Sequence, residues 1–509
     1  MKKYIIGMDI GTQSTKVHLY DEKLELVAIA VREQFVDTPK PMWMTQKASG
    51  WWTRLVESVK EVMATANITG EDVAAFGCCA HMHGAVPVKM DGTVVQDDIQ
   101  LYSDKRGGYL ADQISEQMTD ELFNISANMP IPSWHGIKIK WLKENEPAVY
   151  EQADKFLTPK DFINFKLTGR ACIDYSEGTG VFAMDWKTGK WSDELIKLLD
   201  IDKEKLPEIQ KSYEIVGKVS AQAAAETGLS TNTVVITGGG DMFSMLYVSG
   251  LHRKGSAVDI TGTGGVISGY TETPVMDKRI MNLHHVLDGW VPFGNIDAAG
   301  VSFRFLRDVL CKKERDEARE KGIDDYAYLC QIAEKIPAGS DGLYFLPYLM
   351  GERTMGSADS RGCYIGMSMD KEIGHFIRAL LEGVAFEFKR TLDIFEEHGN
   401  DIQAVYHVGG GAKGDLWNQI KADIYEKPIY TLQTDEGGVL GVALMASYAV
   451  GLIDDLVAKA EEVVKIRKIY EPNQNNFGVY REMKDAFTEL HDTLQKPFKH
   501  MARVQEKYR

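Results

Sequence analysis

A short motif that occurs twice constrains this chain most strongly. Residues 4–21, YIIGMDIGTQSTKVHLYD, pass from an apolar segment through Asp9 and a polar turn into an alternating segment. Residues 256–270, SAVDITGTGGVISGY, repeat that order, with Asp259 at the place of Asp9. Each pattern predicts a strand, a tight turn and a second strand. Two such hairpins, each near the start of one half of the chain, indicate two related domains that face one nucleotide.

The turn of the first hairpin suits the phosphates of a nucleotide triphosphate. Gly11 lets the backbone approach a ligand closely, and Thr12 and Gln13 offer a hydroxyl, an amide and backbone N–H groups. Lys16 adds a positive charge, and Asp9 offers a carboxylate that can hold Mg²⁺ through water. The alternative is an ordinary hydrophilic turn, with Asp9 as its cap and Lys16 as a solvated surface charge.

The turn of the second hairpin is expected to contact the same phosphates from the other domain, through Gly262 and Thr263. Neither hairpin is a common phosphate-binding loop, because the chain lacks G-x-x-x-x-G-K-[ST] and neither turn reads G-x-G-x-x-G. The nucleotide site predicted here is therefore of another type.

A glycine-rich segment, GGGDMF at 238–243, follows the apolar strand TVVITG and is expected to open a helix. Glycine-permitted backbone can project Asp241 into a cleft. Phosphoryl transfer needs a group that takes or orients the proton of the attacking hydroxyl, and Asp241 is our choice for that base. The alternative is a helix N-cap, a common place for aspartate after glycine.

A second glycine-rich segment, VGGGAKGDLWNQIKADI at 408–424, combines a strand end, three glycines and a helix. Gly410 and Gly411 leave room for a flat ring against the backbone. Lys413 and Asn418 lie on or near the first turns of the helix. By itself, a glycine turn before a helix is mostly architectural, and a nucleotide role for Gly410, Gly411, Lys413 and, secondarily, Asn418 follows only from the family resemblance described below.

Short motifs stand in a fixed order from residue 4 to about residue 447. They are DIGTQSTK at 9–16, MHG at 82–84, D-x-R at 104–106, PKDF at 159–162, GGGD at 238–241, TGTGG at 261–265, GERT at 351–354, RALLEGVAFE at 378–387 and VGGGAKGDLWNQIKADI at 408–424. In this order they resemble the FGGY family of sugar kinases, and the MHG element resembles its xylulokinase branch. The resemblance implies an α/β fold of two ribonuclease-H-like domains, as in actin and hexokinase, around a central cleft.

The resemblance also implies roles on the sugar side. It places Met82 and His83 against the sugar hydroxyls, Asp104 and Arg106 near them, and Asp241 at the attacking oxygen. It assigns the 408–424 segment to the adenosine of ATP. A structural role for His83, and a surface ion pair between Asp104 and Arg106, are the local alternatives.

Three residues depart from the usual xylulokinase pattern, and all lie on the presumed sugar side. His81 stands where glutamine is usual, Tyr102 where tryptophan is usual, and Met242 where asparagine is usual. His81 adds a ring that is expected to titrate near neutral pH. We therefore expect D-xylulose as the substrate, phosphorylated to D-xylulose 5-phosphate, and keep another ketose or polyol (ribulose, L-xylulose or erythritol) as the alternative. An actin- or chaperone-like regulatory ATPase is the alternative from another class.

Composition limits the partners. The net charge of −16 argues against nucleic acid and anionic membranes, and any phosphate site must be made locally by glycine-rich backbone, lysine and Mg²⁺. The six cysteines show no metal-like spacing, which is typical of free thiols in a reducing cytosol. Without a signal peptide or a membrane span, a soluble cytoplasmic protein is expected, with ATP, Mg²⁺ and a sugar as ligands. The sequence does not decide between a monomer and a homodimer.

The repeated hairpin also sets the expected domains. Residues 1–248 form the sugar-binding and first phosphate-binding domain, 249–450 the nucleotide-binding domain, and 451–509 a C-terminal helical extension. Gly383, in the middle of a predicted helix over 372–397, is expected to be compensated by a close helix contact. The last helix is expected over 477–498, with a fraying tail beyond it.

Overall fold

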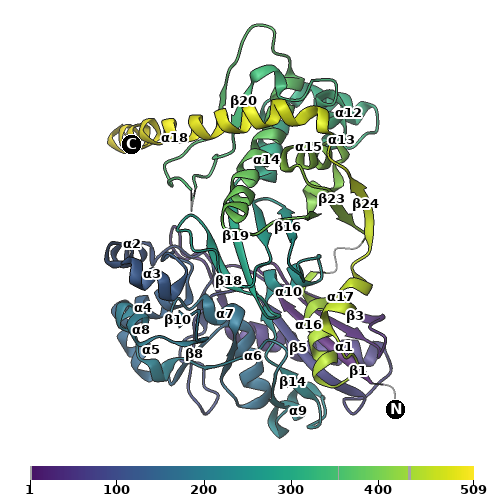
Figure 1. Ribbon diagram of the computed structural model, residues 1–509. Coiled ribbons are helices and arrows are strands. Elements are labelled where there is room, and N and C mark those ends of the chain that lie inside the picture. Colours follow the sequence, from purple (N-terminus) through teal and green to yellow (C-terminus); the bar gives the residue numbers. More distant parts are fainter. Residues whose placement is uncertain (1–2, 353–354, 434–436, 509) are drawn as a thin grey trace.

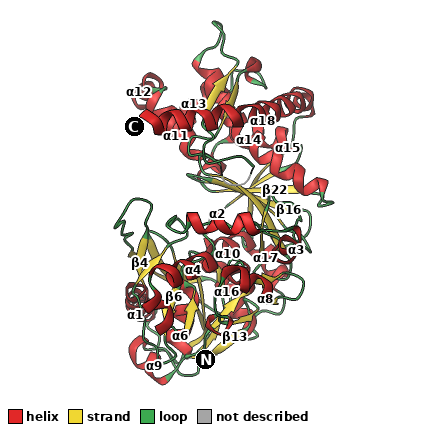
Figure 2. Ribbon diagram, turned by 90° about the vertical axis from the view of Figure 1, so that its left-hand side faces the viewer, coloured by secondary structure: helices red, strands yellow, loops and turns green. Residues whose placement is uncertain are grey.

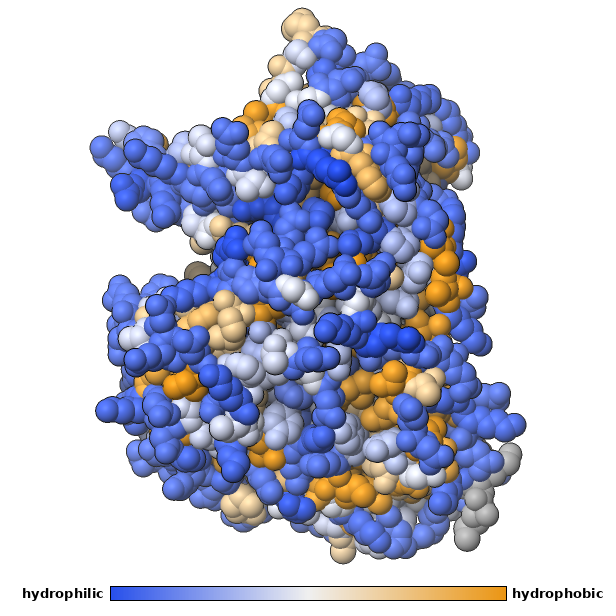
Figure 3. Space-filling model, in the orientation of Figure 1, coloured by the Kyte–Doolittle hydropathy of each residue, from blue (hydrophilic) through white to orange (hydrophobic). Residues whose placement is uncertain are grey.

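The structure is a computed structural model that describes residues 3–352, 355–433 and 437–508. Two α/β bodies lie one above the other (Figures 1 and 2), and the N-terminus belongs to the lower one. The lower body contains most of the first half of the chain, and the upper body most of the second. The surface is deeply notched between them, below the free end of the last helix (Figure 3).

The strands are as follows. They are β1 (Tyr4–Ile10), β2 (Ser14–Tyr20), β3 (Leu26–Glu33), β4 (Thr45–Lys47), β5 (Val73–Ala80), β6 (Val86–Val88), β7 (Asp98–Gln100), β8 (Lys155–Leu157), β9 (Cys172–Asp174), β10 (Met184–Asp185), β11 (Lys190–Trp191), β12 (Glu208–Gln210), β13 (Ile215–Lys218), β14 (Val234–Ile236), β15 (Gly239–Gly240), β16 (Ser256–Thr261), β17 (Gly265–Gly269), β18 (Met281–His284), β19 (Trp290–Ile296), β20 (Tyr344–Leu346), β21 (Cys363–Ile365), β22 (Ala404–Val408), β23 (Ile429–Leu432) and β24 (Ile466–Tyr470).

The α-helices are as follows. They are α1 (Ala48–Thr65), α2 (Gly108–Gln117), α3 (Asp120–Ser126), α4 (His135–Asn145), α5 (Pro147–Gln152), α6 (Pro159–Thr168), α7 (Tyr175–Thr179), α8 (Asp193–Leu199), α9 (Ala221–Thr227), α10 (Asp241–Tyr247), α11 (Gly300–Val309), α12 (Lys312–Glu320), α13 (Asp325–Ala333), α14 (Ile373–Glu397), α15 (Asp415–Tyr425), α16 (Gly437–Ala449), α17 (Leu456–Val463) and α18 (Phe477–Tyr508).

The two large sheets have the same strand order, which explains the repeated hairpin. The first runs β13-β14-β5-β1-β2-β3, and the second runs β24-β23-β22-β16-β17-β19 with β18 added at its edge. In each, three neighbouring strands are parallel (β14-β5-β1 and β23-β22-β16), and the hairpin strand that follows is antiparallel. Both predicted hairpins are therefore confirmed, as β1–β2 and β16–β17.

The last part of the chain differs from the predicted helical extension. Strand β24 pairs with β23, so residues beyond 450 complete the second sheet. Helix α18 continues to Tyr508, past the expected end at residue 498, although its final turns project from the body in Figure 1. The prediction missed the strand because apolar and charged residues do not alternate in its sequence, IRKIY, and only Tyr470 is buried.

Helix α16 belongs to the second half by sequence but covers the first sheet. Two glycines of that sheet allow the close approach. An added Cβ at Gly7 would lie 2.7 Å from the carbonyl oxygen of Val439, and one at Gly77 would lie 2.8 Å from that of Val442. The nearly uniform apolar sequence of α16 follows from this burial, since the helix lies between the first sheet and α10.

The second sheet is joined to the lower body by a buried amide pair. Asn128 Nδ2 donates to the Asn282 carbonyl at 2.7 Å, and the Asn282 backbone N–H donates to Asn128 Oδ1 at 2.8 Å. Asn282 lies on β18, so this strand is the point where the upper sheet is fixed to the α3 region of the lower body.

Gly383 is compensated by a strand and not, as expected, by a helix. A Cβ at this position would lie 2.1 Å from the carbonyl oxygen of Phe345 on β20, so α14 and β20 are in direct backbone contact.

Gly383→Ala should therefore lower the free energy of unfolding by about 1–3 kcal/mol, because overpacking outweighs the gain in helix propensity. Gly478→Ala is the matched control on α18, where an added Cβ meets nothing within 4 Å. That variant should be as stable as the parent or more stable by up to about 1 kcal/mol. Urea unfolding of the two variants measures the difference. Equal stability of both would contradict the close contact.

Candidate active site

Two acidic side chains lie at the ends of strands on either side of β5 in the lower body. Asp9 is near the end of β1, and Asp241 directly follows β15; both strands pair with β5, opposite Cys79 and Ala80. Burial raises the pKa of Asp9 to about 6, against the nearby charge of Lys16. Burial, and then the charge of Asp9, raise the pKa of Asp241 to about 7. The structure thus brings together the two residues predicted for Mg²⁺ and for proton transfer.

The three glycines before Asp241 are required by their surroundings. Gly238 has φ +69°, and a Cβ there would lie 1.9 Å from the Cys78 carbonyl oxygen. A Cβ at Gly239 would lie 2.3 Å from a methyl group of Val286. Gly240 is the N-cap of α10, so Asp241 is the first helical residue rather than the cap, and its Oδ1 accepts from the N–H of Met242. The carboxylate is therefore carried on backbone that fits only glycine.

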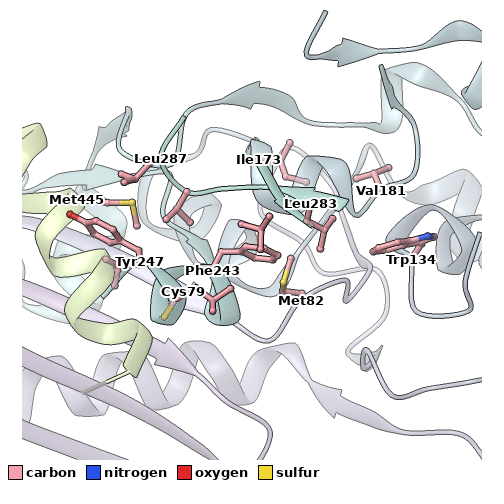
Figure 4. Close-up of a cluster of buried hydrophobic side chains, with 14 of the residues drawn as sticks. Cys79, Met82, Trp134, Ile173, Val181, Phe243, Tyr247, Leu283, Leu287 and Met445 are labelled. Carbon is pink, nitrogen blue, oxygen red and sulfur yellow. The ribbon is translucent and has the colours of Figure 1, made fainter. Parts of the chain in front are cut away.

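The loop with Met82 and His83 lies against this backbone. A Cβ at Gly240 would lie 2.6 Å from Met82 Sδ, and Figure 4 shows Met82 in the same buried cluster as Phe243 of α10 and Leu283 of β18. His83 has φ +68° and is buried, with its ring edge-on to Trp134 at 5.1 Å. The predicted sugar loop and the predicted base are thus neighbours.

Hydrogen bonds to its backbone carbonyls fix the turn of the first hairpin on its inner side. Gly11 N–H donates to the Ser14 carbonyl, and Gln46 Nε2 donates to the Thr12 carbonyl at 2.7 Å. Gln13 and Lys16 are exposed. A turn fixed on its inner side leaves the outer side of the loop available to a ligand.

A cavity of about 700 Å³ in the upper body collects most of the predicted nucleotide residues. Its walls include Gly262, Thr263, Gly410, Gly411 and Lys413. The two glycine turns touch, since a Cβ at Gly411 would lie 2.7 Å from the Thr261 side chain. The remaining lining residues come chiefly from α11, α13 and the start of α15, and include Gly300, Val301, Phe303, Arg304, Asp324, Tyr326, Ala327, Cys330, Gln331, Glu334, Gly414, Asp415, Leu416 and Trp417. No motif marks the α13 residues as part of this wall, because a cavity wall requires none.

Asn418 does not lie in that lining, so its predicted contact with the nucleotide is not supported. It is fully buried; its amide group donates to the Ala412 carbonyl at 2.9 Å, and its oxygen is hydrogen-bonded to His407 Nδ1. Asn418 fastens the glycine turn to the helix that follows it.

Asp104 and Arg106 form an ion pair, as the local alternative proposed, but the pair is buried rather than on the surface. Arg106 donates to both oxygens of Asp104, at 2.9 and 2.7 Å, and its guanidinium stacks 3.7 Å from the ring centroid of Trp43. Asp104 also accepts from the N–H of Met44. Both Asp104 oxygens are occupied by protein donors, and Arg106 uses Nε and Nη2 in the pair, so the pair has a structural role whether or not a sugar lies beside it.

His81 does not titrate near neutral pH, contrary to expectation. It is buried, and burial lowers its pKa to about 3. Its Nε2 donates to Gln46 Oε1 at 3.1 Å, and its ring is edge-on to Trp51. Because the Gln46 amide also holds the turn at Thr12, His81 is linked to the first hairpin. Tyr102 is 41% exposed and Met242 is partly buried.

Three further findings concern metal-ligating clusters, membrane-spanning helices and cysteines. Within the described ranges, no group of three or more His, Cys, Asp or Glu side chains could hold a metal by itself. No helix in those ranges is long and apolar enough to cross a membrane. All six cysteines are free.

Comparison with known proteins identifies the class of enzyme. Residues 4–247 match the N-terminal domain of the FGGY family of carbohydrate kinases, and residues 257–450 match its C-terminal domain. The chain therefore belongs to this family. It is an ATP-dependent carbohydrate kinase of the two-domain, ribonuclease-H-like type, as the order of motifs predicted.

The similar proteins are named for two different substrates, xylulose and gluconate. A xylulose kinase of Bacillus subtilis (strain 168) is 29% identical over 493 residues, covering 96% of this chain and 97% of that protein. A gluconokinase of Bacillus licheniformis is 27% identical over 511 residues, covering 99% of each. The crystal structure of xylulose kinase from Rhodospirillum rubrum has a TM-score of 0.89 at 27% identity, covering 98% of this chain and 100% of that one.

The two hairpins allow a test of the carboxylates by matched substitutions. Asp259, the counterpart of Asp9, is fully buried and paired with Lys421 at 2.7 Å; this neighbouring charge keeps its pKa below the ordinary value despite burial. Asp9 Oδ1 is buried without a hydrogen-bond partner. Asp9→Asn should therefore stabilise the ligand-free protein, and Asp259→Asn should destabilise it by about 3–5 kcal/mol because Lys421 loses its partner.

The effect at Asp9 should depend on pH. Below pH 3.8 the carboxyl is neutral in the folded and the unfolded chain, and the substitution changes little. Between pH 3.8 and about 6 the unfolded chain releases the proton while the folded protein keeps it, so the parent loses stability as pH rises. Above that range Asp9→Asn should gain on the order of 1–3 kcal/mol. Urea unfolding at several pH values measures this, and a destabilised Asp9→Asn protein at pH 8 would contradict the unpaired carboxylate.

Proposed function

We propose that this enzyme transfers the γ-phosphoryl group of ATP to the terminal hydroxyl of D-xylulose, giving D-xylulose 5-phosphate. Asp241 takes the proton of that hydroxyl as its oxygen attacks phosphorus. The observation that supports this assignment best is the position of Asp241, partly buried at the start of α10 beside the loop of Met82 and His83. A pKa raised to about 7 suits a base that works near neutral pH.

The nucleotide is proposed to lie between the two bodies. Its adenosine occupies the cavity lined by Gly410, Gly411 and Lys413, and Gly262 and Thr263 contact its phosphates. Gly11, Thr12, Gln13 and Lys16 contact the β- and γ-phosphates from the lower body. The domains close over the substrates, which excludes water as a competing acceptor.

Asp9 is proposed to hold Mg²⁺, through water. The buried, unpartnered Oδ1 fits this role, because it offers an acceptor that no protein group uses. The absence of a larger ligand cluster among the described residues also fits, since Mg²⁺ usually retains waters and binds phosphate oxygens. When bound, the ion neutralises charge on the phosphates.

A neutral sugar is favoured over a sugar acid by the cations near the loop. Lys138 is buried and donates to the His83 carbonyl at 2.8 Å, and Arg106 is committed to Asp104. A carboxylate at either cation would have to share it with these protein acceptors, whereas a neutral sugar would not compete for the charge. We therefore propose D-xylulose rather than gluconate, with ribulose, L-xylulose and erythritol as competing substrates.

Substitution of the base tests the mechanism. Asp241→Asn should bind ATP like the parent and lose phosphoryl transfer by several orders of magnitude, because an amide cannot accept the proton. Asp9→Asn should instead need more Mg²⁺ for half-maximal rate. Coupled assays and equilibrium ATP binding measure both. Transfer by Asp241→Asn within tenfold of the parent would exclude it as the base, and an unchanged Mg²⁺ titration would leave Asp9 as a turn residue.

A substrate panel tests the sugar. D-Xylulose, D-ribulose, L-xylulose, erythritol and D-gluconate should each be assayed for kcat/KM, and D-xylulose should give the highest value. His83→Ala should lower kcat/KM for the sugar more than Thr12→Ala does. A specificity constant for another compound at least about a hundredfold above that of D-xylulose would reject the proposed sugar and keep the kinase class.

A further inference from the structure

A buried polar network lies directly behind the turn that carries Asp241. Its centre is Asp174, which is fully buried at the end of β9. Asp174 Oδ2 accepts from the Ser176 hydroxyl at 2.5 Å and from the Ser212 hydroxyl at 2.9 Å, and Oδ1 is paired with Lys160 at 2.9 Å. Lys160 is also paired with Asp161 of the PKDF motif.

The network reaches the catalytic turn through one hydroxyl. The Ser176 hydroxyl donates a hydrogen bond to Asp174, and its oxygen accepts a hydrogen bond from the N–H of Gly240 at 3.1 Å. Gly240 immediately precedes Asp241 and is the N-cap of α10. Because Gly240 has no side chain to fix its position, this N–H is the point at which the lower body holds the turn from the side of α7.

The next residue on α7 makes the corresponding contact with the sugar loop. Glu177 Oε2 accepts from the N–H of His83 at 3.2 Å, and the carboxylate is fully buried. Neighbouring residues of one short helix thus hold the two loops whose relative position determines whether a hydroxyl reaches the base. No motif indicates this arrangement, since DYSEGTG at 174–180 resembles an ordinary capped turn.

We propose that Ser176 is a positioning residue for phosphoryl transfer, whose hydroxyl, oriented by Asp174, fixes Gly240 and thereby the place of the Asp241 carboxylate. The inference rests on the proposed role of Asp241 as the base. Ser176 touches no reacting atom in this account. A carboxylate displaced by a fraction of an ångström loses its alignment with the attacking hydroxyl, although ATP and the sugar still bind.

Ser176→Ala should therefore lower kcat by about 10- to 100-fold, with the KM values for ATP and sugar within about threefold of the parent. Ser212→Ala is the matched control. It removes the same kind of hydroxyl from the same Asp174 oxygen, is equally interior, and has no hydrogen bond to Gly240. It should keep kcat within about twofold. Ser176→Cys, with a weak acceptor of similar size, should fall between parent and alanine, and it carries the test if the alanine variant does not fold.

The outcomes separate this inference from the function it rests on. Ser176→Ala with the kcat of the parent, an equal loss in Ser212→Ala, or a change in KM alone would overturn the positioning role while Asp241→Asn stays inactive. An Asp241→Asn enzyme that keeps transfer within tenfold would overturn both the base and the positioning role. A loss of kcat confined to the Ser176 variants, graded from cysteine to alanine, would support it.

Discussion

The fold places two carboxylates, Asp9 and Asp241, in partly buried positions without giving either an ion pair with a protein cation. In the part of the chain that the structure describes, neither forms an ion pair, and burial raises the pKa of each. Such an arrangement is unfavourable for folding, because charge is left unsatisfied in a poorly solvated place. It is what a kinase needs, because Mg²⁺ and a substrate hydroxyl can complete it. The glycines before Asp241, the loop of Met82 and helix α16 all surround this point.

Comparison of the two hairpins shows what the lack of a cationic partner at Asp9 changes. Asp259 has the same sequence context as Asp9 and the same place in its sheet, but Lys421 and Tyr425 fill its surroundings. The upper hairpin is thereby a structural element that lines a cavity, and the lower one presents a free carboxylate oxygen. Two domains of one architecture thus differ, with the cavity in one and the unpaired carboxylates in the other, and under the proposed mechanism they hold the nucleotide and the reacting groups respectively.

Much of this was predictable from the sequence, because strand and turn patterns are local. The two hairpins, the helix that begins at Asp241 and the glycine turn at Gly410 all follow from short segments. The failures concern contacts made across long distances. His81 was expected to titrate, but Trp51 and Gln46 enclose it. Asn418 was the secondary nucleotide candidate, and its sequence context did not reveal that its side chain turns inward to His407. Burial of a single polar side chain cannot be inferred from its neighbours in sequence.

The division of tasks between the bodies has a consequence for motion. The cavity with Gly410 and Gly411 belongs to the upper body, and the carboxylates to the lower one, so transfer requires the two to hold one nucleotide together. Small-angle X-ray scattering of the protein with a non-hydrolysable ATP analogue, with sugar, and with both tests this directly. The account predicts a smaller radius of gyration with both ligands than with either alone. The same radius of gyration in all states, under conditions where calorimetry shows both ligands bound, would contradict it.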